Sequence, residues 1–182
     1  MSESIVDGTG KGYEAKVDSD NRVHTFSVIE PGDKAGNRNG YNWSLPFTTT
    51  PTGAGDYFFY MANTGNNDLL ITDIRIYCAA ADRFTINKVT GTPSYAAGGT
   101  ITPVSKNLGQ LRTVSATIKY DTDTTGLTDG GKIYDIPTPV ANTLVTLTTS
   151  ANIIIPKGTA IAMKATTGTA SLTCVVSIVE DA

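Results

Sequence analysis

The sequence contains few charged residues. Asp, Glu, Lys and Arg make up 17% of the 182 residues, and the formal net charge is −3; about a quarter is usual in globular domains. Lys and Arg form no cluster anywhere along the chain. A nucleic-acid-binding surface needs such a cluster to neutralise phosphates. We therefore expect no nucleic-acid partner.

Long apolar runs are also missing. A membrane-spanning helix needs about twenty consecutive apolar residues, and the chain has no such run. The stretch Ser2–Ser4 is acidic and no apolar core follows it, unlike a secretory signal. We expect no membrane partner. The protein is expected to stay inside the cell that makes it, or to leave as part of a larger particle.

Residues for acid–base catalysis are scarce. His24 is the only histidine, the G-x-S-x-G pattern is absent, and the few glutamates (Glu3, Glu14, Glu30, Glu180) lie on no predicted central strand. One His and two distant Cys lack zinc-ligand spacing. A paired-carboxylate glycosidase stays open as an alternative. We interpret the chain as a non-enzyme without a metal centre.

The glycine-rich segment Gly8–Gly12 raises the possibility of a phosphate-binding loop. Gly12 and Tyr13 follow Lys11, so the hydroxyl that would hold magnesium is missing, and the glycine spacing fits neither nucleotide motif. We interpret the segment as part of a polar N-terminal arm and predict no cofactor.

Two further features concern possible cross-links and cations. Cys78 and Cys174 lie in alternating apolar runs, which predicts buried free thiols; a disulfide is the alternative. The segment 121–129 begins like an EF-hand loop, but position twelve is Lys132 and not Glu. A solvated turn is favoured there, and a loose cation site that includes Asp129 stays open.

The residues that are abundant favour strands and turns. Thr, Val, Ile and Tyr favour strands, and Gly, Asn and Pro favour turns. In 69–78, period-two alternation places Leu70, Thr72, Ile74, Ile76 and Cys78 on an inward face, opposite Asp73, Arg75 and Tyr77. The strand 56–63 is predicted to form a hairpin with it. Other predicted strands are 83–89, 114–120, 132–136, 143–149, 153–155, 160–165 and 172–179.

These runs predict an all-β fold. About eight to ten short strands at this spacing fit a jelly-roll-type antiparallel β-sandwich. We predict an extended N-terminal arm over residues 1–27 and the sandwich domain over 28–182. Tyr41, Trp43, Leu45 and Phe47 alternate as core residues of a first main strand; exposed rings that stack on sugars are the alternative.

Two segments resemble virion structural proteins of tailed bacteriophages. They are DGTGKGYEAKVDSDNRVHTFSVIEP (7–31) and NIIIPKGTAIAMKATTGTASLTCVVSIVEDA (152–182). The resemblance implies a capsid decoration (cement) protein with a jelly-roll fold, assembled in the host cytoplasm and located on the capsid surface. It also implies the major capsid protein as partner and a homo-oligomer, with a trimer as the expected state.

Within the arm, the large apolar side chains are the expected capsid contacts: Ile5, Val6, Tyr13 and Val17. The alternative function is a receptor- or carbohydrate-binding β-sandwich of a phage tail or fibre. Exposed aromatic rings in 41–47 and 57–60 would favour that alternative, and buried rings would favour the cement protein.

Overall fold

The computed structural model describes residues 5–6, 14–15, 40–109, 112–138 and 140–181. Contacts divide the chain into two units, Met1–Pro31 and Gly32–Ala182. In the first unit the described residues form one antiparallel pair, β1 (Ile5–Val6) with β2 (Glu14–Ala15). Tyr13, Val17, His24, the segment Gly8–Gly12 and the predicted boundary after residue 27 all lie outside the described residues. The arm and its contacts therefore stay predictions.

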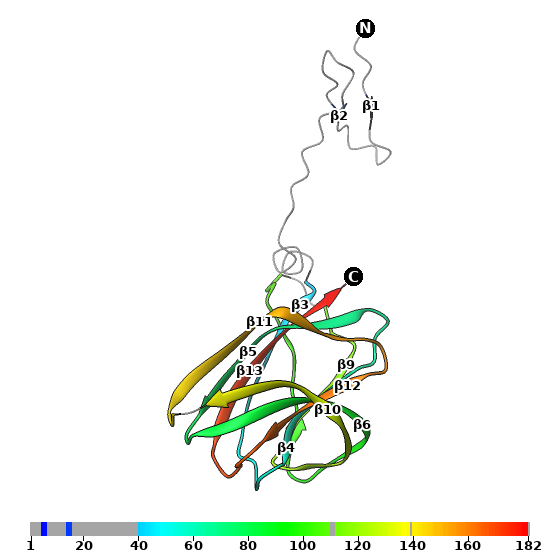
Figure 1. Ribbon diagram of the computed structural model, residues 1–182. Helices are drawn as coiled ribbons and strands as arrows, with labels where there is room; N and C mark the ends of the chain where they lie inside the picture. Colours follow the sequence, from blue (N-terminus) through cyan, green and yellow to red (C-terminus); the bar gives the residue numbers. More distant parts are fainter. Residues whose placement is uncertain (1–4, 7–13, 16–39, 110–111, 139, 182) are drawn as a thin grey trace. The chain divides into compact units, whose positions relative to one another are not determined.

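The second unit consists of two antiparallel sheets packed face to face (Figure 1). The six-stranded sheet has the order β10 (Thr124–Thr138), β6 (Asp82–Tyr95), β12 (Ala160–Ala165), β4 (Tyr57–Asn63), β9 (Ala116–Tyr120), β7 (Gly99–Thr100). The five-stranded sheet has the order β11 (Thr143–Ile155), β5 (Asp68–Cys78), β13 (Leu172–Asp181), β3 (Asn42–Thr49), β8 (Val104–Ser105). The described residues contain no helix that could cross a bilayer.

The connectivity is that of a jelly roll. The chain alternates between the sheets, from β3 to β4, β5 and β6, and again from β10 to β11, β12 and β13. The strands β7, β8 and β9 lie in the long connection between β6 and β10 and extend the sheets at their edges. Eight main strands wound in this way form a double-sheet sandwich. The predicted fold class is confirmed.

The core lies between the sheets and is rich in aromatic rings. Phe47 of β3 stacks on Phe59 of β4, with ring centroids 5.4 Å apart. Phe58 meets Phe84 of β6 edge to face at 5.5 Å. Trp43 is 1% exposed, and its indole Nε1 donates to the carbonyl of Arg112 at 3.2 Å. Each such ring stabilises the fold by roughly 1.5–3 kcal/mol through burial. The core interpretation is confirmed for Trp43, Leu45 and Phe47, whereas Tyr41 precedes β3 and is half-buried against the core.

The predicted hairpin between 56–63 and 69–78 is wrong. Both segments are strands, but β4 pairs with β9 and β12, whereas β5 pairs with β11 and β13 in the other sheet. The turn at 64–67 therefore carries the chain across the sandwich. Both strands present an apolar face. In a jelly roll the two strands lie in opposite sheets, so these faces pack against each other across the core and the strands do not pair as neighbours in one sheet.

A β-bulge changes the inward face of β5. Ser177 of β13 faces Asp73 and Ile178 faces Ile71, so Thr72 is an extra residue on β5. Leu69 and Ile71 are consequently buried, whereas Leu70 and Thr72 are half-buried. The predicted alternation holds from Ile74 to Cys78 and is wrong before the bulge, because one inserted residue reverses the alternation.

Three strands are several residues longer than predicted. β6 covers 82–95, where 83–89 was predicted. β10 covers 124–138, and 143–149 and 153–155 form the single strand β11, with a register irregularity between Thr148 and Ile153. Pro137 lies in β10, an edge strand, where no ladder donor is needed. Glu180 lies on β13, the middle strand of its sheet, which corrects the expectation that no glutamate lies on a central strand.

Both cysteines are buried and unpaired, as predicted. Cys78 and Cys174 are 0% exposed and free. They lie on the adjacent strands β5 and β13, where Cys78 faces Leu172 and Cys174 faces Ile76. Burial, together with the nearby Asp73 carboxylate, raises the pKa of the Cys174 thiol far above its ordinary value. The thiols therefore act as small apolar core groups.

Candidate functional site

Residues that could meet a partner lie on the outer faces of the two sheets. Seven large apolar side chains are exposed among the described residues, and five of them lie on or next to β5, β10 and β11. Tyr77 and Leu144 are cross-strand partners on the five-stranded sheet. Ile133 and Ile154 line one hollow of about 230 Å³ where the edge strands β10 and β11 approach each other. This side of the sandwich is its more apolar side.

The segment 121–129 is not the solvated turn that the sequence favoured. Asp121 is 0% exposed, and its carboxylate accepts hydrogen bonds from the backbone N–H groups of Ala96, Ala97 and Thr122 at 2.6–2.9 Å. From Thr124 the segment belongs to β10. Asp121 thus pins the end of β6 to the start of β10.

Acidic groups lie near this junction. Burial raises the pKa of Asp123, and the charges of Asp56 and Asp121 raise it further. Among the described residues, no three His, Cys, Asp or Glu side chains are grouped so that they could hold a metal ion. The Asp129 carboxylate, the further ligand considered for a loose cation site, takes part in a different contact network.

That network lies on the outer face of the six-stranded sheet. The Asn87 amide donates to both Asp129 carboxylate oxygens, at 3.0 and 2.9 Å, and Lys164 Nζ donates at 3.2 Å. The backbone N–H of Gly131 donates at 2.9 Å, and the Tyr57 hydroxyl also bonds this carboxylate. Asp129 on β10 is thereby tied to β4, β6 and β12.

The network shifts two pKa values in opposite directions. Hydrogen bonds from Asn87 and Gly131, assisted by Lys164 and Tyr57, lower the pKa of Asp129 to about 2 against the opposing effect of burial. Burial and the neighbouring Asp129 raise the pKa of Tyr57 to about 12. Asp129 stays ionised and Tyr57 stays a donor, which suits a structural clamp that needs no proton transfer.

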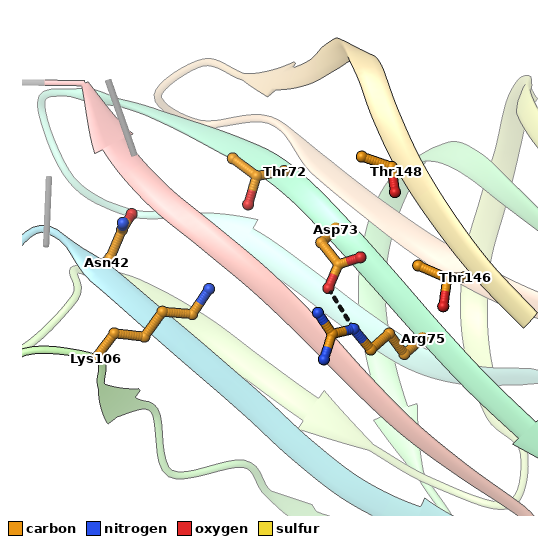
Figure 2. A pocket seen from close by; sticks show the side chains of 7 residues that line it. All are labelled: Asn42, Thr72, Asp73, Arg75, Lys106, Thr146 and Thr148. Carbon is orange, nitrogen blue, oxygen red and sulfur yellow. Dashed lines mark ion pairs between the residues drawn. The ribbon is translucent and has the colours of Figure 1, made fainter. Parts of the chain in front are cut away.

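A second polar site lies on the outer face of the five-stranded sheet. A hollow of about 310 Å³ is lined by seven residues from β3, β5, β11 and the segment after β8, shown as sticks in Figure 2: Asn42, Thr72, Asp73, Arg75, Lys106, Thr146 and Thr148. The bulge at Thr72 creates part of this wall, because it brings the side chains of Thr72 and Asp73 to the same face.

The central contact of the hollow is the ion pair between Arg75 and Asp73. Arg75 Nε lies 2.9 Å from Asp73 Oδ2. Figure 2 shows the two terminal guanidinium nitrogens on the side of the group that faces Lys106. The Arg75 side chain is 58% exposed and that of Asp73 only 16%. The less exposed Asp73 carboxylate thus holds the Arg75 guanidinium in place. The more exposed Arg75 side chain lines the hollow.

The hollow offers hydrogen-bond donors and acceptors for binding. Of the described residues that line it, none is a histidine, a cysteine or an aromatic residue. Thr72 Oγ1 donates to the Ser177 carbonyl at 3.4 Å, and Thr146 and Thr148 are exposed on β11. Among these described lining residues Asp73 is the single carboxylate, and its charged partner is Arg75.

Sequence reasoning located only part of this site. It placed Asp73 and Arg75 on the outer face of their strand, but predicted that Thr72 points inward. The approach of Lys106 and the β11 threonines depends on strand order, which no local pattern reveals.

Searches of protein-family models, curated proteins and solved structures find no match to this chain.

Proposed function

We propose that this protein is a structural component of a bacteriophage particle. In this proposal it binds the outside of the capsid as a decoration or cement protein, stabilises the shell and performs no catalysis. The observation that carries the proposal is the burial of the aromatic rings. Trp43, Phe47, Phe58, Phe59 and Tyr60 are each less than 8% exposed, so they stabilise the sandwich and are not available to a ligand.

The same observation disfavours the receptor- or carbohydrate-binding alternative. Sugar-binding sandwiches stack exposed rings on their ligands, and Tyr77 is the only aromatic ring among the exposed large apolar side chains of the described residues. Among the described residues, no aromatic ring lines the hollow around Arg75, and the Tyr57 ring in the Asp129 network is half-buried with Lys164 over it, so neither polar surface offers an exposed aromatic platform. A domain that acts by broad adhesion needs none, because area and complementarity stabilise such contacts.

The remaining parts of the proposal follow from the phage resemblance. The partner is the major capsid protein, and the site of action is the capsid surface. The arm, residues 1–27 with Ile5, Val6, Tyr13 and Val17, contacts the shell, and strand addition to a neighbouring sheet edge would supply main-chain hydrogen bonds. We further propose a homo-oligomer, with a trimer as the expected state.

The test is binding of the purified protein to emptied, expanded capsids of its own phage. Co-sedimentation through a density gradient should place the protein in the capsid fraction, and decorated capsids should resist heating better than bare ones. Unexpanded procapsids serve as the control shell. Failure to co-sediment with expanded capsids, combined with binding to host-cell glycans, would replace this proposal by the receptor-binding one.

A further inference from the structure

We propose that the hollow around Arg75 is a receptor for a carboxylate group, presented by an acidic side chain of the protein partner to which this face docks. The inference rests on the proposed function for the identity of the partner. The carboxylate-binding chemistry itself is argued from the geometry of the hollow.

The Asp73–Arg75 contact prepares the guanidinium for such a ligand. The ion pair joins Nε of Arg75, and neither terminal nitrogen, to Asp73 Oδ2 at 2.9 Å. Among the described residues, the two terminal nitrogens of Arg75 have no hydrogen-bond partner. These nitrogens form the fork that binds a carboxylate through two parallel hydrogen bonds. Since Asp73 already holds the side chain, less rotamer entropy is lost on binding.

The surroundings of the hollow favour an anion. The hollow is lined by two cationic side chains, Arg75 and Lys106, and by one carboxylate, Asp73, in a chain whose net charge is −3. The adjoining strand β11, Thr143–Ile155, contains no charged residue at all. No carboxylate from that strand can therefore compete for the guanidinium.

The other lining groups match the size and polarity of one carboxylate side chain. Thr146 and Thr148 are exposed beside Arg75 and carry hydroxyls that can donate to a second carboxylate lone pair. The volume of about 310 Å³ is at the lower end for small-molecule sites. Without an aromatic wall, the hollow suits the tip of an acidic side chain better than a sugar ring.

The first experiment uses the isolated protein, with sodium acetate as the probe. Backbone and guanidinium NMR signals are followed during titration, with sodium chloride at equal ionic strength as the salt control. Acetate should shift the Arg75 Nε signal and the amides of Thr146 and Thr148, and Arg75→Gln should abolish these shifts. Arg83→Gln is the matched control, since Arg83 is an equally exposed, carboxylate-paired arginine on the other sheet. Acetate shifts no larger than those with chloride would overturn the proposal.

The second experiment measures binding of the protein to expanded capsids. Arg75→Gln should weaken binding at least about tenfold, because the partner's carboxylate loses its charged donors. Arg75→Lys should also weaken it, since lysine keeps the charge but lacks the fork; Arg83→Gln should bind like wild type. Thermal unfolding verifies that each variant is folded.

Wild-type affinity in Arg75→Gln would overturn the carboxylate receptor and leave the cement function standing. Absence of capsid binding by the wild-type protein would instead refute the proposed function. The acetate titration would still decide whether the hollow binds a carboxylate.

Discussion

Replacing Asp129 by Ala should destabilise the sandwich although the residue lies on its surface. The substitution removes the acceptor shared by Asn87, Gly131, Lys164 and Tyr57. Asn87 is only 3% exposed, so its amide cannot readily turn to water. The edge strand β10 would then lose the side-chain attachment that joins it to β6 and β12.

The magnitude follows from these contacts. A buried donor left without a partner costs about 1–3 kcal/mol. The ion pair with Lys164 adds about 0.2–1 kcal/mol at most, because the Asp129 side chain is 39% exposed and its charge is screened. We expect the free energy of unfolding to fall by about 2 kcal/mol. Asp129→Asn should cost less, since the amide oxygen still accepts a hydrogen bond.

The assay is urea unfolding at neutral pH, repeated at acidic pH. The folded-state pKa of Asp129, about 2, lies below the unfolded value of about 3.9. Its stabilisation is therefore complete above the unfolded pKa and disappears as the pH falls through the folded pKa. The difference between wild type and Asp129→Ala should accordingly shrink from about pH 4 to about pH 2.

Two controls separate this network from general surface charge. Asp135→Ala removes a carboxylate on the same strand that pairs with the exposed Arg83 and Lys132, and it should cost less than Asp129→Ala. A double-mutant cycle of Asp129→Ala with Asn87→Ala should give a coupling of about 0.5–3 kcal/mol. A coupling near zero would refute the claim that Asn87 depends on Asp129.

Three further predictions concern the core, the thiols and the arm. Phe59→Ala should lower the free energy of unfolding by about 3–5 kcal/mol in a denaturant titration, and a loss under 1 kcal/mol would contradict its place at the centre of the aromatic core. Cys78 and Cys174 should resist a thiol reagent in the native protein and react as two thiols after unfolding; rapid native reaction would disprove burial. Deleting residues 1–27 should preserve cooperative unfolding and abolish capsid binding, whereas non-cooperative unfolding would show that the segment belongs to the folded domain.

Period-two alternation predicted the inward faces of regular strands well. Leu172, Cys174, Val176 and Ile178 of β13 are all buried as expected, because no inserted residue interrupts the register of β13 with β3. The same argument failed in the first half of β5, where the inserted Thr72 reverses the faces. An extra residue leaves no composition signal, since Thr suits either face.

Long-range pairing was harder to predict than local structure. The turn 64–67 contains Gly and Asn, which suit a hairpin and a crossover between sheets equally well. The pairing of β13 with β5 and β3 joins residues that lie between 94 positions (Cys78 and Leu172) and 137 positions (Asn42 and Val179) apart. The candidate hollow depends on that order, because Arg75 and Thr146 meet through neighbouring strands and Lys106 arrives from the opposite edge of the sheet. Local patterns therefore identified Asp73 and Arg75 but not their neighbours.

The two outer faces of the sandwich differ in how far their polar groups are satisfied internally. On the six-stranded sheet, Asp129 is bonded by donors from three other strands, and Asp135 is bonded by Arg83 and Lys132. A partner docking there would have to replace bonds that already exist. On the five-stranded sheet, the Arg75 fork and the exposed β11 threonines can gain bonds without breaking any. Since association is favoured where desolvation is repaid by new contacts, the five-stranded face is the one that we expect to meet the capsid.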